Sequence, residues 1–128
     1  MRVAIVDDSS FICLVCRQII EKSGYEVVGE SFDGEDCIDL VKETKPDLIL
    51  MDMALPKQSG IQAIKKIKKI FPNQLFLGIS AIDEDWLREE AIESGCFGFL
   101  ENPFESRQLI SYLEEAESLL STGEVKYG

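Results

Sequence analysis

Short runs of apolar residues alternate along this chain with longer segments in which apolar residues recur every three or four positions. A short continuous apolar run is typical of a strand buried on both faces, whereas the wider spacing is typical of a helix with one buried face. The runs predict five strands, at residues 2–7, 25–31, 47–52, 75–80 and 96–100.

A segment with helical spacing follows each expected strand. The first begins after Ser9 and Ser10, which can cap a helix, and Gly24 marks its end. The others are expected at 34–44, at 61–71 before Pro72, at 83–94, and after Pro103. The positions expected to face inward are Phe11 or Ile12, Val15 and Ile19; Cys37, Ile38 and Val41; Ile61, Ile64, Ile67 and Ile70 or Phe71; and Leu109, Leu113, Ala116 and Leu120.

Strands that alternate with helices over short connections run parallel, with right-handed crossovers and helices on both faces of the sheet. We therefore expect an α/β protein with a doubly wound, five-stranded parallel sheet, five helices and the flavodoxin-like strand order 2-1-3-4-5. A chain of 128 residues has room for one domain, which we expect to span 1–122, with a short tail at 123–128.

The charge balance narrows the classes of partner. The chain has 24 acidic and 13 basic residues, a net charge of −11, which disfavours nucleic acid and anionic membranes and favours a cationic partner or ion. No apolar run approaches the ~20 residues that span a bilayer or the roughly 7–15 of a secretion signal, so we expect a soluble, cytoplasmic protein. The lysines of the third helix are expected to form a solvated face rather than a nucleic-acid patch; they are Lys65, Lys66, Lys68 and Lys69.

Cys13 and Cys16 form a CxxC motif, which can indicate a redox pair or half of a zinc site. The chain has no histidine and no second CxxC to complete four zinc ligands. The motif also lies inside an apolar helical stretch, so we interpret these cysteines as small buried core residues.

Polar side chains gather where the expected strands end. Asp7 and Asp8 follow the first strand, Asp52 ends the third, Ser80 ends the fourth, and Asn102 lies just past the fifth. Loops at the carboxyl ends of parallel strands form the site in such sheets, so three carboxylates should converge there. Carboxylates so close together repel one another, and this arrangement is stable only where a cation binds between them. A set of ligands made only of oxygen atoms favours Mg²⁺. The alternative interpretation is that the three aspartates are unrelated surface residues that bind no ion.

The chain resembles the bacterial response-regulator receiver family (CheY-like) over about residues 2–120. The likeness rests on the segments VDDS, MDMALPKQSG, ISA and NPF in this order. Their spacing is 44 residues from Asp8 to Asp52, 28 more to Ser80 and 22 more to Asn102. The resemblance implies a phosphoprotein switch of a two-component system that catalyses only its own phosphorylation and dephosphorylation.

The resemblance implies roles for the acidic residues. Asp52 matches the aspartate that takes a phosphoryl group from the phosphohistidine of a histidine kinase or phosphotransfer protein. Asp8, Asp52 and the backbone carbonyl of Ala54 would hold Mg²⁺, and Asp7 would act through water.

The resemblance to receivers also implies how phosphorylation would change the surface of the protein. Ser80 matches the hydroxyl that moves to the phosphoryl group, and Phe99 matches the aromatic switch that swings inward after it. A downstream protein would then dock on the face formed by residues 83–120. Pro56 and Gly60 match the loop that shapes the acceptor's surroundings, and Trp86 could be a binding anchor or partial core.

The sequence departs from the family at Asn102, where receivers carry a lysine that pairs with the phosphoryl oxygens. Exchanging a charged for a neutral hydrogen bond removes on the order of 1–2 kcal/mol, about tenfold in phosphoryl stabilisation. Lys57, in the loop after Asp52, could supply the missing positive charge instead. The alternative function is a degenerate receiver that binds proteins without phosphorylation.

Two enzymatic alternatives find little support in the sequence. A haloacid-dehalogenase-like phosphatase needs an acid two residues after its aspartate nucleophile, and Ala54 stands there. No glycine-rich nucleotide-binding motif occurs. In receivers, the water that attacks the acyl phosphate is flanked by side chains at positions that match Ala54 and Ile82. Both are apolar here, so we expect slow decay of the phosphorylated form.

Overall fold

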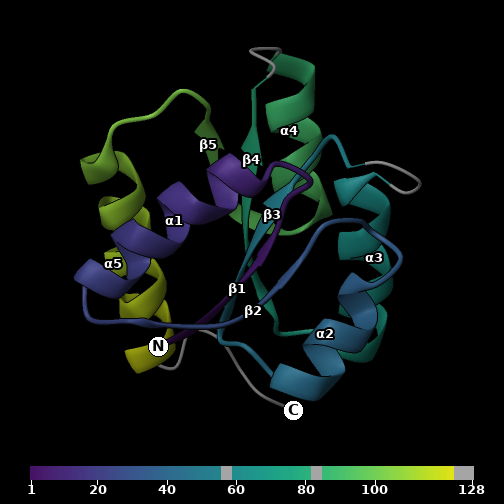
Figure 1. Cartoon of the computed structure of the whole chain (residues 1–128). Coiled ribbons are helices and arrows are strands. Elements are labelled where there is room, and N and C mark those ends of the chain that lie inside the picture. The colour runs from purple at the N-terminus through teal and green to yellow at the C-terminus, as the bar shows by residue number, and fades with distance from the viewer. Residues whose placement is uncertain (56–58, 82–84, 123–128) are drawn as a thin grey trace.

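The computed structural model describes residues 1–55, 59–81 and 85–122. Within them lies a single five-stranded sheet whose strands are all parallel and follow the order β2-β1-β3-β4-β5 (Figure 1). The predicted α/β class and strand order are therefore confirmed. The strands are β1 Arg2–Val6, β2 Glu26–Ser31, β3 Leu48–Asp52, β4 Leu75–Ser80 and β5 Cys96–Glu101.

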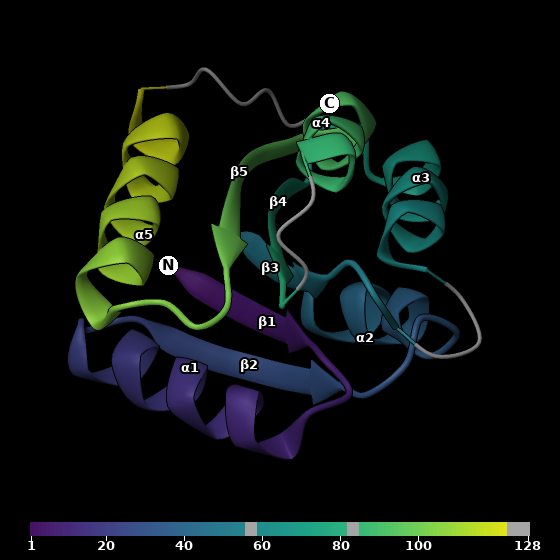
Figure 2. The ribbon, with the colours of Figure 1, turned by 90° about the horizontal axis from the view of Figure 1, so that it is seen from above.

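Five helices cover the two faces of the sheet. Figure 2 shows α1 and α5 on one face and α2, α3 and α4 on the other. No helix in the described part of the chain is long and apolar enough to cross a membrane. The helices are α1 Ser10–Lys22, α2 Cys37–Thr44, α3 Gly60–Ile70, α4 Asp85–Ser94 and α5 Ser106–Ser121.

Alternate residues of the central strands point into two separate cores. On β3, Leu48 and Leu50 pack in the core beneath α1 and α5, whereas Ile49 and Met51 pack in the core beneath α2, α3 and α4. Every residue of β3 and β4 is buried. This double burial explains why the strands are continuous apolar runs and not alternating ones.

The inward face of α1 differs from the prediction. Its buried residues are Cys13, Cys16 and Ile20, whereas Phe11 is 62% exposed. Both sets of residues recur at helical spacing, and the packing of α1 against β2 and α5 selects the set with the smaller side chains. The prediction for the CxxC is confirmed, because both cysteines are buried free thiols, and burial raises their pKa values to about 11 and about 12.

Local hydrogen bonds account for two helix starts. The Asp33 carboxylate accepts the backbone amides of Glu35 and Asp36, so a turn precedes α2 and the helix begins at Cys37, later than the predicted residue 34. Ser59 and Gln62 form a capping box at the start of α3.

The inward faces of the other helices follow the prediction except at their ends. Ile70 is 47% exposed at the end of α3, while Phe71 is half-buried, and Leu120 is half-buried at the end of α5. Lys65, Lys66 and Lys69 are exposed on α3, as a solvated face requires. The ammonium of the half-buried Lys68 lies 6.0 Å from the centre of the Phe76 ring.

Candidate functional site

A crevice of about 370 Å³ opens at the carboxyl ends of β1, β3 and β4. The expected residues meet there, contributed by four strand ends that lie side by side in the sheet. Of the two residues expected to face inward at the start of α1, Ile12 packs partly against the core, whereas Phe11 is exposed at this crevice. The crevice is lined by Asp7, Asp8, Ser9, Phe11, Ile12, Asp52, Ala54, Ile79, Ser80, Ala81 and Asn102.

Three carboxylates form the acidic part of the crevice. One oxygen each from Asp7, Asp8 and Asp52 lies within 4.8 Å of the other two. Asp7 is 5% and Asp52 is 9% exposed, whereas Asp8 faces solvent. No other group of three histidine, cysteine or acidic side chains in the described residues is close enough to share an ion.

Backbone hydrogen bonds hold the two buried carboxylates in place. The Asp7 amide donates to the carbonyl of Ser31, and its carboxylate accepts the amide of Ser9 at 2.9 Å. The Asp52 carboxylate accepts the amide of Ala54, also at 2.9 Å. Each carboxylate thus has one oxygen bound by the turn that follows its strand, so the orientation of both is fixed before any ligand arrives.

The pKa values show that this crowding is unfavourable. Burial, together with the charges of Asp7 and Asp8, raises the pKa of Asp52 to about 7, against the opposing hydrogen bond from the Ala54 amide. Burial is also the main cause of the raised pKa of Asp7. A divalent cation would relieve both effects. Three carboxylate oxygens, without nitrogen or sulfur, fit the preferences of Mg²⁺.

Ser80 and Asn102 lie on the other side of the crevice. Ser80 ends β4 and is 3% exposed. The backbone amide of Asn102 donates to the Ser80 carbonyl at 2.8 Å, and the neutral Asn102 is one of the residues that line the crevice. Lys57, the possible substitute, lies outside the described residues, as do Pro56 and Ile82.

Gly60 is required by a close approach of the backbone. A Cβ at this position would meet the carbonyl oxygen of Asp52 and would lie 2.8 Å from the Cα of Met53. The absence of a side chain therefore lets the start of α3 pack directly against the end of β3.

Phe99 is already turned inward in this structure. Its side chain is 4% exposed and packs beside Gly78, where a Cβ would lie 3.1 Å from the Phe99 ring. The Arg88 guanidinium covers the ring at 5.3 Å from its centre and forms an ion pair with Glu101. The sequence analysis did not identify this pair, because only the packing of α4 on β5 brings the two residues together.

Comparison with known proteins agrees with this architecture. Residues 3–114 match the response regulator receiver domain family. The chain is 40% identical over 114 residues to the chemotaxis protein CheY of Thermotoga maritima, covering 89% of this chain and 95% of that protein. It is 35% identical over 119 residues to the transcriptional regulatory protein PdtaR of Mycobacterium tuberculosis, covering 91% of this chain and 57% of that protein.

Among solved structures, the CheX–CheY–BeF₃–Mg²⁺ complex of Borrelia burgdorferi superposes with a TM-score of 0.86 at 25% identity. This match covers 90% of the present chain and 87% of the other. Receiver domains are signalling modules that bind Mg²⁺ in an acidic pocket, and the cluster of three aspartates has the composition of such a pocket. From its sequence match, its strand order and this acidic crevice, the chain belongs to the response-regulator receiver family of two-component systems.

Proposed function

We propose that this chain accepts a phosphoryl group on Asp52 from the phosphohistidine of a kinase or phosphotransfer protein and then changes its protein contacts. One observation carries the proposal: Asp52 is a buried carboxylate held by the Ala54 amide and faced by two further carboxylates in an open crevice. An acidic cluster of this kind, with two of its three carboxylates buried, is costly unless a cation binds there, and a bound cation would in turn attract an anionic phosphoryl donor to Asp52.

In the transfer step, an Asp52 carboxylate oxygen attacks the phosphorus while the bond from phosphorus to the histidine nitrogen breaks. The electron pair of that bond leaves with the imidazole, and Asp52 becomes an acyl phosphate. Asp7, Asp8, Asp52 and the backbone carbonyl of Ala54 would hold Mg²⁺, which supplies positive charge to the phosphoryl oxygens. We propose no catalysis beyond this step and the hydrolysis of the acyl phosphate, in which water takes the phosphoryl group and inorganic phosphate leaves.

Ser80 and Asn102 are proposed to bind the transferred group. The Ser80 hydroxyl would donate to a phosphoryl oxygen, and the Asn102 carboxamide would donate a second, neutral hydrogen bond. Because Asn102 carries no charge, the metal would provide most of the charge compensation.

The signal is proposed to spread through Phe99. This residue lies two positions before Glu101, which pairs with Ser80 in the sheet register. A movement of Ser80 would therefore reach Phe99, Arg88 and the surface of α4, β5 and α5, where a downstream protein would dock. Trp86 is 55% exposed on α4, which supports its interpretation as part of that docking surface.

The second candidate function is a degenerate receiver that binds its partner without phosphorylation. One observation favours it: Asn102 stands where receivers carry a charged residue. In this case the α4–β5–α5 surface would be permanently competent to bind.

Phosphorylation itself separates the two functions. The native chain is incubated with acetyl phosphate and Mg²⁺, and its intact mass is compared with that of Asp52→Ala and of a sample treated with EDTA. The proposal requires one added phosphoryl group in the native chain with Mg²⁺ only. An unmodified native chain under these conditions would favour the degenerate receiver.

A further inference from the structure

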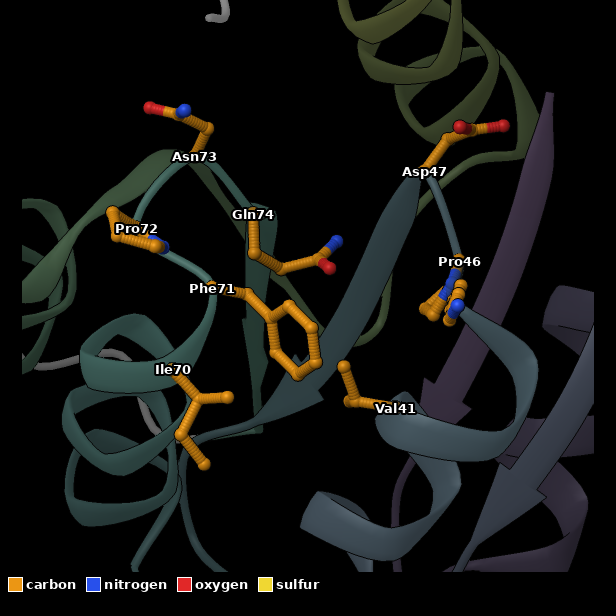
Figure 3. A pocket seen from close by; sticks show the side chains of 9 residues that line it. Val41, Pro46, Asp47, Ile70, Phe71, Pro72, Asn73 and Gln74 are labelled. Atoms are coloured by element: carbon orange, nitrogen blue, oxygen red, sulfur yellow. The ribbon is translucent and has the colours of Figure 1, made fainter. Parts of the chain in front are cut away.

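A second hollow, of about 320 Å³, lies at the opposite end of the sheet from the acidic crevice. Figure 3 shows it between the connection from α2 to β3 and the connection from α3 to β4. β3 and β4 separate it from Asp52 and Ser80, a distance of roughly 17–20 Å at the usual rise per residue of a strand. Its walls include Val41, Pro46, Ile70, Phe71, Pro72 and Gln74.

The walls of this hollow are tied to the rest of the fold. The Arg2 guanidinium donates to the carbonyl of Lys45, and the Arg2 amide donates to the Asp47 carboxylate at 2.8 Å. On the other side, the Gln74 amide donates to the carbonyl of Phe71 at 3.1 Å. The two connections are therefore fixed, and the hollow does not need to be opened by a ligand.

Gln74 supplies an unused acceptor. It is 9% exposed, and its side-chain nitrogen donates to the carbonyl of Leu75 at 3.3 Å, but within the described residues its side-chain oxygen accepts no hydrogen bond. Figure 3 shows the carboxamide and the Phe71 ring projecting together toward Val41 and Pro46. A buried acceptor without a donor is energetically unfavourable, so a ligand that donates to it gains affinity.

We propose that this hollow is a binding site for a small uncharged molecule with one aromatic ring and one O–H or N–H donor, of the phenol type. The volume is near the lower end of the roughly 300–1,000 Å³ of ligand pockets, which suits a single ring. The ring would pack on Phe71 and Val41, and its donor would bind the oxygen of Gln74. A neutral ligand is favoured because the lining includes one basic and one acidic residue, Lys45 and Asp47, and so carries no net charge.

The test uses 4-ethylphenol and its methyl ether, 4-ethylanisole, which keeps the ring but has no donor. Each is titrated into the full-length chain while backbone amide resonances are followed by NMR. We expect saturable shifts in residues 41–47 and 70–75, with little change at Asp7, Asp8 and Asp52. The phenol should bind about fivefold more tightly than the ether, the value of one net hydrogen bond.

Gln74→Met removes the acceptor but keeps a side chain of similar size, so it should abolish the preference for the phenol. Ile70→Ala, at an exposed wall position, should weaken both ligands equally. If neither ligand shifts residues 41–47 and 70–75, or if the native chain binds both equally, the proposal is wrong. The comparison of the two ligands on the native chain remains decisive even if Gln74→Met does not fold.

Discussion

The guanidinium of Arg88 lies over the ring of Phe99, with 5.3 Å between its central carbon and the ring centre. Arg88 belongs to α4 and also pairs with Glu101, so one side chain joins this helix to two positions of β5. Phe99 is thereby held between Gly78 beneath it and Arg88 above it. Under the proposed relay, a rearrangement that begins at Ser80 alters this contact on its way to the surface.

Arg88→Ala should weaken the link between α4 and β5. On phosphorylation, amide exchange should change more in residues 85–112 than in 10–44 of the native chain, and Arg88→Ala should reduce this difference. The loss of stability should be below about 1 kcal/mol because the ion pair is partly exposed. Arg107→Ala, which removes an exposed ion pair with Glu105, is the control. Equal exchange changes in the two segments would contradict the proposed relay.

Asn102→Lys should increase the fraction of chain that acetyl phosphate modifies, because a lysine adds the positive charge that the crevice lacks. The expected gain in the phosphorylated population at equal donor concentration is up to about tenfold. Gln18→Lys makes the same chemical change on an exposed position of α1 and should have little effect. No gain from Asn102→Lys would indicate that another cation, such as Lys57, already contacts the phosphoryl group.

The raised pKa of Asp52 predicts an unusual pH dependence of stability. In EDTA the folded state favours the protonated carboxyl, so its stabilising contribution is complete below about pH 4 and is lost as the pH rises through about 7. Asp52→Asn should remove the Asp52 part of this dependence, leaving a smaller part from Asp7, and should be more stable at pH 8 by on the order of 2 kcal/mol once solvent screening is allowed for. Chemical denaturation at several pH values measures the free energy of unfolding of the native chain and of Asp52→Asn. Saturating Mg²⁺ should reduce the difference in unfolding free energy between the two chains at pH 8. If the stability of both chains depends equally on pH, the raised pKa does not belong to Asp52.

Ala54 and Ile82 are predicted to make the acyl phosphate long-lived. Ala54 is exposed at the crevice and cannot orient a water molecule, and Ile82 lies outside the described residues. Ala54→Asn with Ile82→Glu should speed decay of the purified phosphoprotein several-fold by positioning the attacking water. Ala54→Val with Ile82→Leu, which stays apolar, is the matched control. Unchanged decay in the polar double variant would show that water access does not limit hydrolysis.

The acidic crevice could be predicted from the sequence because it depends on topology alone. Once the strands are parallel, their carboxyl ends meet at one edge, so Asp7, Asp8, Asp52 and Ser80 must converge. The roles assigned to these residues came from the family resemblance and stay predictions.

The features that the sequence did not reveal depend on how helices pack. The burial of Cys13 was predicted, but the sequence left open whether Phe11 or Ile12 faces inward, and only the packed structure shows that Phe11 is exposed and Ile12 is half-buried. The contact between Arg88 and Phe99 requires the position of α4 relative to β5. The free acceptor of Gln74 becomes visible only when the connections on either side of it are placed.

The most direct test of the account is to locate the phosphoryl group. The chain is treated with acetyl phosphate and Mg²⁺, then with borohydride, which reduces an aspartyl phosphate to homoserine, and is digested for tandem mass spectrometry. The account predicts homoserine at position 52 alone, dependent on both Mg²⁺ and donor. Homoserine at another aspartate, or none at any position while the phosphodonor and Mg²⁺ are present, would contradict it.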